Sequence, residues 1–263
     1  MRGLVGVLFG LIALPQALLA QDRGQDVLYV SATAQSGVGL NGAGGEVEWL
    51  RPASAATNVT AGGGATSISD IWWMYGTGGA TTRHGGAIYS GRVSLGSGRW
   101  SSGPFPYMQY VGAVTLPIAR GMYVNTEAQR VSLAGEAATV LKVGTLLTVS
   151  RGSTVGVAYH AAPWEPSRDR AVSVRADVNV RGVSVLGGAV ASARKVAAAN
   201  IQAIDLTTRI APEYFGGCSV PVSTSQLIVS VQVAPQPPGR FVRFLVSLRH
   251  PLGDRASGSG VGR

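Results

Sequence analysis

The stretch 169–181, DRAVSVRADVNVR, alternates between aliphatic and polar side chains from Val172 to its end. A period of two indicates a β-strand, because successive side chains of a strand point to opposite faces. Such a strand suits a soluble β-sandwich, and it also suits a membrane barrel with lipid outside and water inside. The aliphatic set is Val172, Val174, Ala176, Val178 and Val180, and the polar set is Ser173, Arg175, Asp177, Asn179 and Arg181.

The same two-faced pattern recurs in 121–131, 138–149, 219–233 and 239–250. In the last of these, Val242, Phe244 and Val246 alternate with polar neighbours. No sustained 3.6-residue periodicity is present, and Gly and Pro interrupt the chain at short intervals, which is typical of all-β proteins. We predict fourteen strands, with twelve as the alternative count because the third, fourth, eleventh and twelfth are weakly patterned. They are 27–34, 45–50, 56–62, 70–78, 86–95, 105–116, 121–131, 138–149, 153–160, 170–181, 183–191, 201–209, 219–233 and 239–250.

Composition separates three parts of the chain. Residues 1–20 combine a positive start, an apolar run and a small residue before Gln21, which predicts a secretory signal peptide cleaved after Ala20; an N-terminal membrane anchor is the alternative. Residues 21–250 carry the strands, and the Gly- and Ser-rich residues 251–263 are expected to be a disordered tail. Only 13% of the residues are charged, against about 25% in soluble domains, and the mean hydropathy is +0.22. An exported, apolar, helix-poor chain favours a single antiparallel up-and-down transmembrane β-barrel.

Long and short connections alternate along the predicted strands. The connections near 35–44, 96–104, 161–169 and 192–200 are long, whereas 51–54, 117–120, 150–152 and 181–182 are tight turns. Bacterial outer-membrane barrels have this asymmetry, with long loops outside and short turns on the periplasmic side. Both termini are therefore expected to be periplasmic. Two connections, 79–85 and 210–218, are long where the rule requires short ones.

Aromatic residues gather near the predicted strand ends, which favours two girdles at the membrane interfaces. For any single residue, an ordinary core or loop position is the alternative. The set is Trp49, Trp72, Trp73, Tyr75, Trp100, Phe105, Tyr107, Tyr159, Trp164, Tyr214 and Phe215.

Charged residues on the polar faces are the candidates for the lining of the lumen. Six are basic and two are acidic, and rings of positive charge favour anions in a water-filled pore. The alternative is a plugged barrel in which these charges pair across strands. The residues are Arg92, Glu127, Lys142, Arg175, Asp177, Arg181, Arg243 and Arg249.

The motifs for catalysis and cofactor binding are weak. His160 is predicted at a rim with Glu165 and Asp169, where it could act as a base, but no nucleophile elbow accompanies it. The GxGxxG match at 37–42 precedes a strand rather than a helix, which indicates a loop. Cys218 is the only cysteine, which excludes a disulfide framework and a cysteine-cluster metal site and predicts a small buried or turn residue. We expect no enzyme, cofactor or metal, and a chain exported without a basic helix or stacking motif is not expected to bind nucleic acid.

One resemblance is carried by a strand–turn–strand unit. Residues 141–147, LKVGTLL, followed by Arg151-Gly152 and then 155–159, VGVAY, are similar to units of YaiO-type outer-membrane barrels. The resemblance implies an envelope protein linked to exopolysaccharide systems. The chain departs from the usual pattern because its last strand is followed by a tail, whereas such barrels end on a terminal aromatic residue that the assembly machinery recognises.

These observations predict a barrel in the outer membrane of a Gram-negative bacterium. The expected function is a pore, or an export or accessory channel, for small or anionic solutes or exopolysaccharide. The expected partners are outer-membrane lipid, the barrel-assembly machinery and periplasmic or exopolysaccharide-export proteins. A surface enzyme or adhesin on the long loops of a closed barrel is the first alternative, and a soluble secreted β-sandwich is the second.

Overall fold

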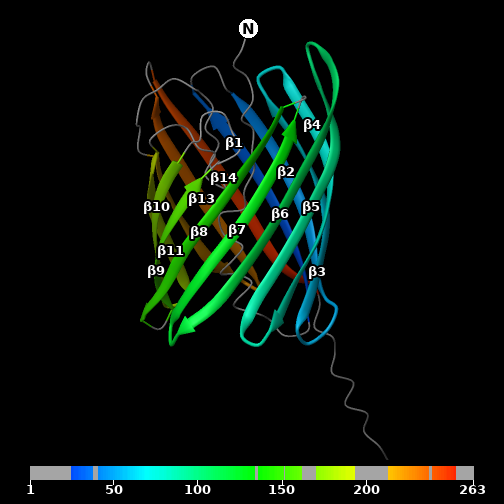
Figure 1. Cartoon of the computed structure of the whole chain (residues 1–263). Helices are drawn as coiled ribbons and strands as arrows, with labels where there is room; N and C mark the ends of the chain where they lie inside the picture. Colours follow the sequence, from blue (N-terminus) through cyan, green and yellow to red (C-terminus); the bar gives the residue numbers. More distant parts are fainter. Residues whose placement is uncertain are drawn as a thin grey trace, which may run out of the picture.

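The computed structural model describes residues 25–37, 41–133, 136–150, 152–161, 170–192, 213–236 and 239–252. These residues form fourteen antiparallel strands that close into one barrel, whose strands are inclined to its long axis (Figure 1). The strands are β1 (Asp26–Ser36), β2 (Gly42–Pro52), β3 (Thr57–Ile68), β4 (Ile71–His84), β5 (Ala87–Trp100), β6 (Gly103–Ala119), β7 (Met122–Leu133), β8 (Glu136–Ser150), β9 (Ser153–Ala161), β10 (Arg170–Val180), β11 (Val183–Ser192), β12 (Glu213–Val222), β13 (Ser225–Gln236) and β14 (Gly239–Leu252).

Every strand pairs with its neighbours in sequence, and β1 pairs with β14 from Asp26↔Leu252 to Ser36↔Val242. This last pairing removes the free edges that an open sheet would expose. The predicted all-β, up-and-down architecture and the count of fourteen strands are therefore confirmed. Within the described part of the chain, no helix is long and apolar enough to cross a membrane.

The two faces of the wall differ as the alternation in 169–181 predicts. Val174 on β10 is 47% exposed, whereas Asp177 on the same strand is 8% exposed. Because the sheet is closed, the exposed face is the outside of the barrel and the buried face is its interior. Large apolar side chains stand exposed on the outside of most strands, among them Val47, Met74, Leu95, Val143, Val157, Val185 and Phe244. The apolar exterior excludes the soluble sandwich, in which aliphatic side chains would fill the core.

The two rims of the barrel carry different connections. One, which we call the turn rim, has the short connections 53–56, 85–86, 120–121, 151–152, 181–182 and 223–224, together with the first residue of β1 and the last of β14. The other, the loop rim, has 37–41, 69–70, 101–102, 134–135, 162–169, 193–212 and 237–238. Arg181 and Gly182 have φ values of 53° and 84°, the conformation of a two-residue hairpin turn. The predicted asymmetry holds for 37–41, 162–169 and 193–212, whereas the other four connections of the loop rim span two residues each.

Several predicted boundaries are wrong. Residues 79–84 and 213–218 belong to β4 and β12, so the two connections that broke the alternation are strands, and only Ser101 and Ser102 separate β5 from β6. These segments are rich in Gly, Ser and Thr, which indicate loops by composition, but here neighbouring strands pair with their backbone on both sides. The predicted strand 219–233 is a hairpin that turns at Ser223 and Thr224.

Three predictions lie outside the described residues: the signal peptide, the strand at 201–209 and the tail beyond residue 252. Cys218, predicted as a buried or turn residue, is half-buried within β12. It pairs with Val185 and Val229, which places it on the outer face.

Candidate functional site

The predicted lining residues occupy alternating positions opposite the exposed aliphatic ones. Seven of the eight lie on the interior face, in β5, β7, β8, β10 and β14. The eighth, Arg181, is in the turn between β10 and β11 and is exposed there. Its place in the strand pattern was predicted wrongly because the turn begins one residue earlier than the alternation suggests.

The interior charges contact one another. Arg92 binds Glu46 and also lies 3.6 Å from Glu48. Lys142 lies 3.6 Å from Glu127 on the adjacent strand. Arg175 donates to Asp177 two residues along its own strand, at 2.7 and 2.9 Å, rather than across strands as the plugged-barrel alternative supposed.

Glu46 and Glu48 are interior acids that the sequence prediction missed. Their signal was the alternation Glu46-Val47-Glu48, which marks a strand with acids on one face. Without Arg181 the predicted interior set has 6 − 1 = 5 basic residues, and with the two glutamates it has 2 + 2 = 4 acidic residues. Arg83 adds a further base on the interior face of β4 at the turn rim, so the described strands form a lining of mixed charge rather than a strongly basic one.

Further hydrogen bonds link polar side chains of neighbouring strands on the interior face. Arg92 Nε donates to Thr77 Oγ1 at 2.8 Å, and Ser94 Oγ donates to the same oxygen at 3.1 Å. On the seam between the first and last strands, Arg243 Nη2 donates to Gln35 Oε1 at 2.9 Å. These contacts fix polar side chains on the interior face, near mid-strand for Arg92, Thr77 and Ser94 and near the loop rim for Gln35.

His160 is not a surface base. It lies in the interior near the end of β9, 3% exposed, and its Nε2 is 2.8 Å from Ser173 Oγ. Its predicted companions, Glu165 and Asp169, lie outside the described residues. A buried histidine held by a serine gives the surface-enzyme alternative no exposed catalytic group at this position.

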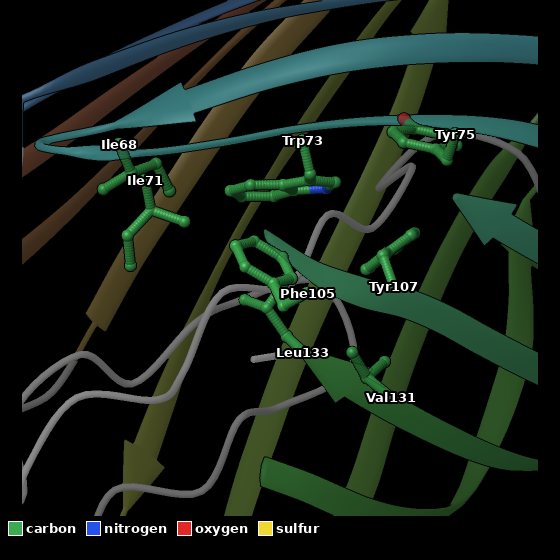
Figure 2. Packing of buried hydrophobic residues seen from close by; sticks show 8 residues of the cluster. All are labelled: Ile68, Ile71, Trp73, Tyr75, Phe105, Tyr107, Val131 and Leu133. Carbon is green, nitrogen blue, oxygen red and sulfur yellow. The ribbon is translucent and has the colours of Figure 1, made fainter. Parts of the chain in front are cut away.

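An apolar cluster lies on the interior face close to the loop rim. Trp73 is 0% exposed, and its ring centroid lies 6.1 Å from that of Tyr107. Figure 2 shows Phe105 next to Trp73, with Ile68 and Ile71 to one side. We call this set the aromatic cluster: Ile68, Ile71, Trp73, Tyr75, Phe105, Tyr107, Val131 and Leu133, with Trp100 packed against it.

The cluster corrects part of the girdle prediction. Trp73, Tyr75, Phe105 and Tyr107 face the interior, whereas Trp72 is 45% exposed on the outside. Adjacent tryptophans in one strand must point to opposite faces, so the pair Trp72-Trp73 could have shown that one of the two side chains faces the interior. Phe215 also packs inside, while Tyr159 and Tyr214 are exposed on the outer face; Trp164 lies outside the described residues.

Two glycines of β5 make room for the rings. Gly98 lies directly between Trp73 of β4 and Phe105 of β6, and Gly96 lies between Tyr75 and Tyr107. A Cβ at Gly98 would come within 2.5 Å of Phe105 Cζ and 2.6 Å of Trp73 Cβ. The rings can therefore converge over β5 only because Gly96 and Gly98 have no side chain.

We expect Gly98→Ala to reduce the free energy of unfolding by about 1–3 kcal/mol, the usual cost of inserting a methyl group into filled space. Gly91→Ala is the matched control, because Gly91 lies on the same strand with nothing within 4 Å of an added Cβ. Urea midpoints of the barrel in lipid vesicles, read from heat-modifiable gel mobility, measure both. Equal midpoints for the two variants would show that the rings do not depend on Gly98.

No family model and no curated protein sequence matches the chain. Solved structures do resemble it in fold. The CymD monoaromatic hydrocarbon channel has a TM-score of 0.65 at 8% identity, covering 92% of each chain. The Pseudomonas putida toluene transporter TodX has a TM-score of 0.57 at 8% identity, covering 93% of each.

A bacterial polysaccharide outer membrane secretin also matches, with a TM-score of 0.58 at 8% identity over 89% of this chain and all of the other. The chain shares the fold of these channel barrels. At such identities the likeness concerns the backbone, so the chemistry of the interior has to be argued from this chain's own side chains. Those side chains are an aromatic cluster near the loop rim and a network of paired charges nearer mid-strand.

Proposed function

We propose that the chain is an outer-membrane channel that carries small apolar solutes with aromatic rings from the loop rim toward the interior. The aromatic cluster is the observation that supports the proposal most directly. A solute ring can replace the contacts that Trp73, Phe105 and Tyr107 make with one another, because offset and tilted ring pairs are exchangeable in energy. The apolar exterior supports the placement in a membrane, with lipid as the immediate partner.

Three features support passive passage over a surface enzyme. The fold is that of channel barrels, the interior carries the aromatic and charged side chains, and His160 is buried. The anion selectivity expected from six basic residues loses its basis once Glu46 and Glu48 are included. The proposed cargo is accordingly uncharged.

Polysaccharide export is the second candidate. It is favoured by the likeness to the secretin barrel and by the hydrogen-bonding side chains of the interior, among them Gln35, Gln109, Gln129 and Gln232. The YaiO-type resemblance, with its exopolysaccharide link and its periplasmic or assembly partners, belongs to this second candidate. An export channel would depend on these amides, whereas a channel for aromatic solutes would depend on the rings.

The test is uptake of toluene at low concentration by cells that express the chain and have no other hydrocarbon channel. We expect Trp73→Ala combined with Phe105→Ala to lower the uptake rate about tenfold, which corresponds to about 1.4 kcal/mol of lost ring contact. Trp72→Ala is the control, since Trp72 is the neighbouring residue on the outer face. Gel mobility of the membrane fraction confirms equal amounts of folded barrel.

Unchanged toluene uptake in the double variant would overturn the aromatic channel. If, in addition, a separate Gln109→Leu, Gln129→Leu variant lost secretion of a polymer, polysaccharide export would replace the aromatic channel as the proposed function.

A further inference from the structure

The interior wall formed by β2 to β6 changes in polarity along its length. We call it the graded wall. From the structure, and given the proposed channel function, we infer that this wall recognises aromatic solutes carrying a neutral hydroxyl group, with phenol as the simplest example, in preference to aromatic carboxylates. Three successive levels of the wall carry the inference.

The level nearest the loop rim is formed by aliphatic and aromatic side chains. Ile68 ends β3, Ile71 begins β4 and Phe105 lies two residues from the start of β6. All three are at most 7% exposed, and they pack with Trp73. Apart from the indole Nε1 of Trp73, the side chains of this level offer the ring of a solute apolar contacts alone.

The next level adds hydroxyl groups to the rings. Two residues farther along the same strands, Tyr75 and Tyr107 replace Trp73 and Phe105, with ring centroids 5.4 Å apart. The Tyr107 hydroxyl donates to Gln109 Oε1 at 3.0 Å. A phenol oxygen has a single hydrogen, so the Tyr107 oxygen can still accept one from a solute. The Tyr75 hydroxyl lies against Gly64 of β3, the cross-strand partner of Glu46, so this level adjoins the charges beyond.

The third level is charged, but its one cation, Arg92, is already paired with acidic side chains and does not attract an anionic solute. Arg92 is bound by Glu46, lies close to Glu48 and donates to Thr77 as well. The three charged groups together carry +1 − 2 = −1. A carboxylate that pointed inward from a ring held in the apolar level would meet net negative charge in a partly desolvated wall, where repulsion is stronger than in water. A neutral hydroxyl would meet hydrogen-bond acceptors.

The levels lie in the order that a hydroxylated ring requires. Its ring occupies the apolar level while its hydroxyl donates to Tyr107. A hydrocarbon can contact the rings but donates no hydrogen bond to Tyr107, and a carboxylate is opposed by the third level. One neutral hydrogen bond contributes about 1 kcal/mol, so the expected preference of the hydroxyl level is about fivefold.

The test is calorimetric binding of phenol, toluene and benzoate to the purified barrel in detergent. We expect phenol to bind more tightly than benzoate, and Tyr107→Phe to weaken phenol about fivefold while toluene affinity stays unchanged. Tyr110→Phe is the control, because Tyr110 lies on the same strand but is exposed on the outer face. Glu46→Gln combined with Glu48→Gln should bring benzoate closer to phenol.

The outcomes separate this inference from the proposed function. If toluene binds and Tyr107→Phe changes phenol and toluene equally, the hydroxyl level is wrong while the aromatic channel stands. If benzoate binds as tightly as phenol to the unaltered barrel, the charge argument is wrong. If none of the three compounds binds, both the inference and the aromatic channel are overturned.

Discussion

Replacing Arg92 with Gln is expected to lower the free energy of unfolding by about 3–5 kcal/mol, the usual cost of removing one partner from a buried ion pair. Glu46 and Glu48 are both mostly buried, and each would keep its negative charge within reach of the other once the guanidinium is gone. Thr77 would lose a hydrogen-bond donor at the same time. Urea unfolding in lipid vesicles, followed by tryptophan fluorescence, measures the loss.

The matched control removes the two acids together with the base. In the triple variant Arg92→Gln, Glu46→Gln, Glu48→Gln no buried charge is left unpaired, so most of the lost stability should return. Conductance in planar bilayers provides a second readout, since Arg92→Gln alone changes the charge of this group from −1 to −2 and should increase cation preference. A single variant as stable as the parent would mean that the carboxylates are solvated and that Arg92 does not hold them.

The strand pattern could be predicted where the two faces of a strand differ in chemistry. In β10 the valines and the charged residues separate from Val172 onward, with Arg170 at the start of the strand as the exception, so the strand and its facing followed from the period alone. Closure into a barrel followed from the apolar character of so many outward faces together with the absence of helical periodicity. Weak amphipathicity hid the extent of β3, β4 and β12, whose glycines and threonines resemble loop residues.

The interior contacts could not be predicted, because they depend on register between strands. Arg92 and Glu46 lie on β5 and β2, three strands apart, and no local pattern brings them together. The aromatic cluster is likewise assembled from β3, β4, β6 and β7. Because the rings of the cluster lie near strand ends, they were predicted at the lipid interface. The alternation of side chains along each strand would have predicted that they face the interior.

The aromatic cluster and the charged group depend on each other through β4 and β5. Tyr75 contacts Tyr107 on one side and lies near Glu46 on the other. On the interior face of β5, the fully buried Ser94 lies between Arg92 and Gly96, which is beside the rings. Stabilising the charges therefore also fixes the rings above them. Because of this coupling, a substitution at Arg92 is expected to affect solute binding as well as unfolding.

Val174→Arg is expected to destabilise the barrel by about 2–4 kcal/mol, the cost of an arginine on the lipid-facing surface near the midplane of a bilayer. Val174 lies in the middle of β10 and is 47% exposed, with Val157 beside it on β9. Val180→Arg is the control, because Val180 ends the same strand at the turn rim, where an arginine reaches the interface and costs about 0–1 kcal/mol. Unfolding midpoints in vesicles measure both variants.

The comparison decides where lipid lies, because the two valines share a face and differ only in depth. In a soluble protein, exposed valines at these two sites would tolerate arginine equally. A cost that appears at position 174 and not at 180 therefore requires a hydrocarbon layer around the middle of the barrel. Equal costs at both sites would place water against the valines. The membrane location would then be wrong, and so would the proposed channel and its solute.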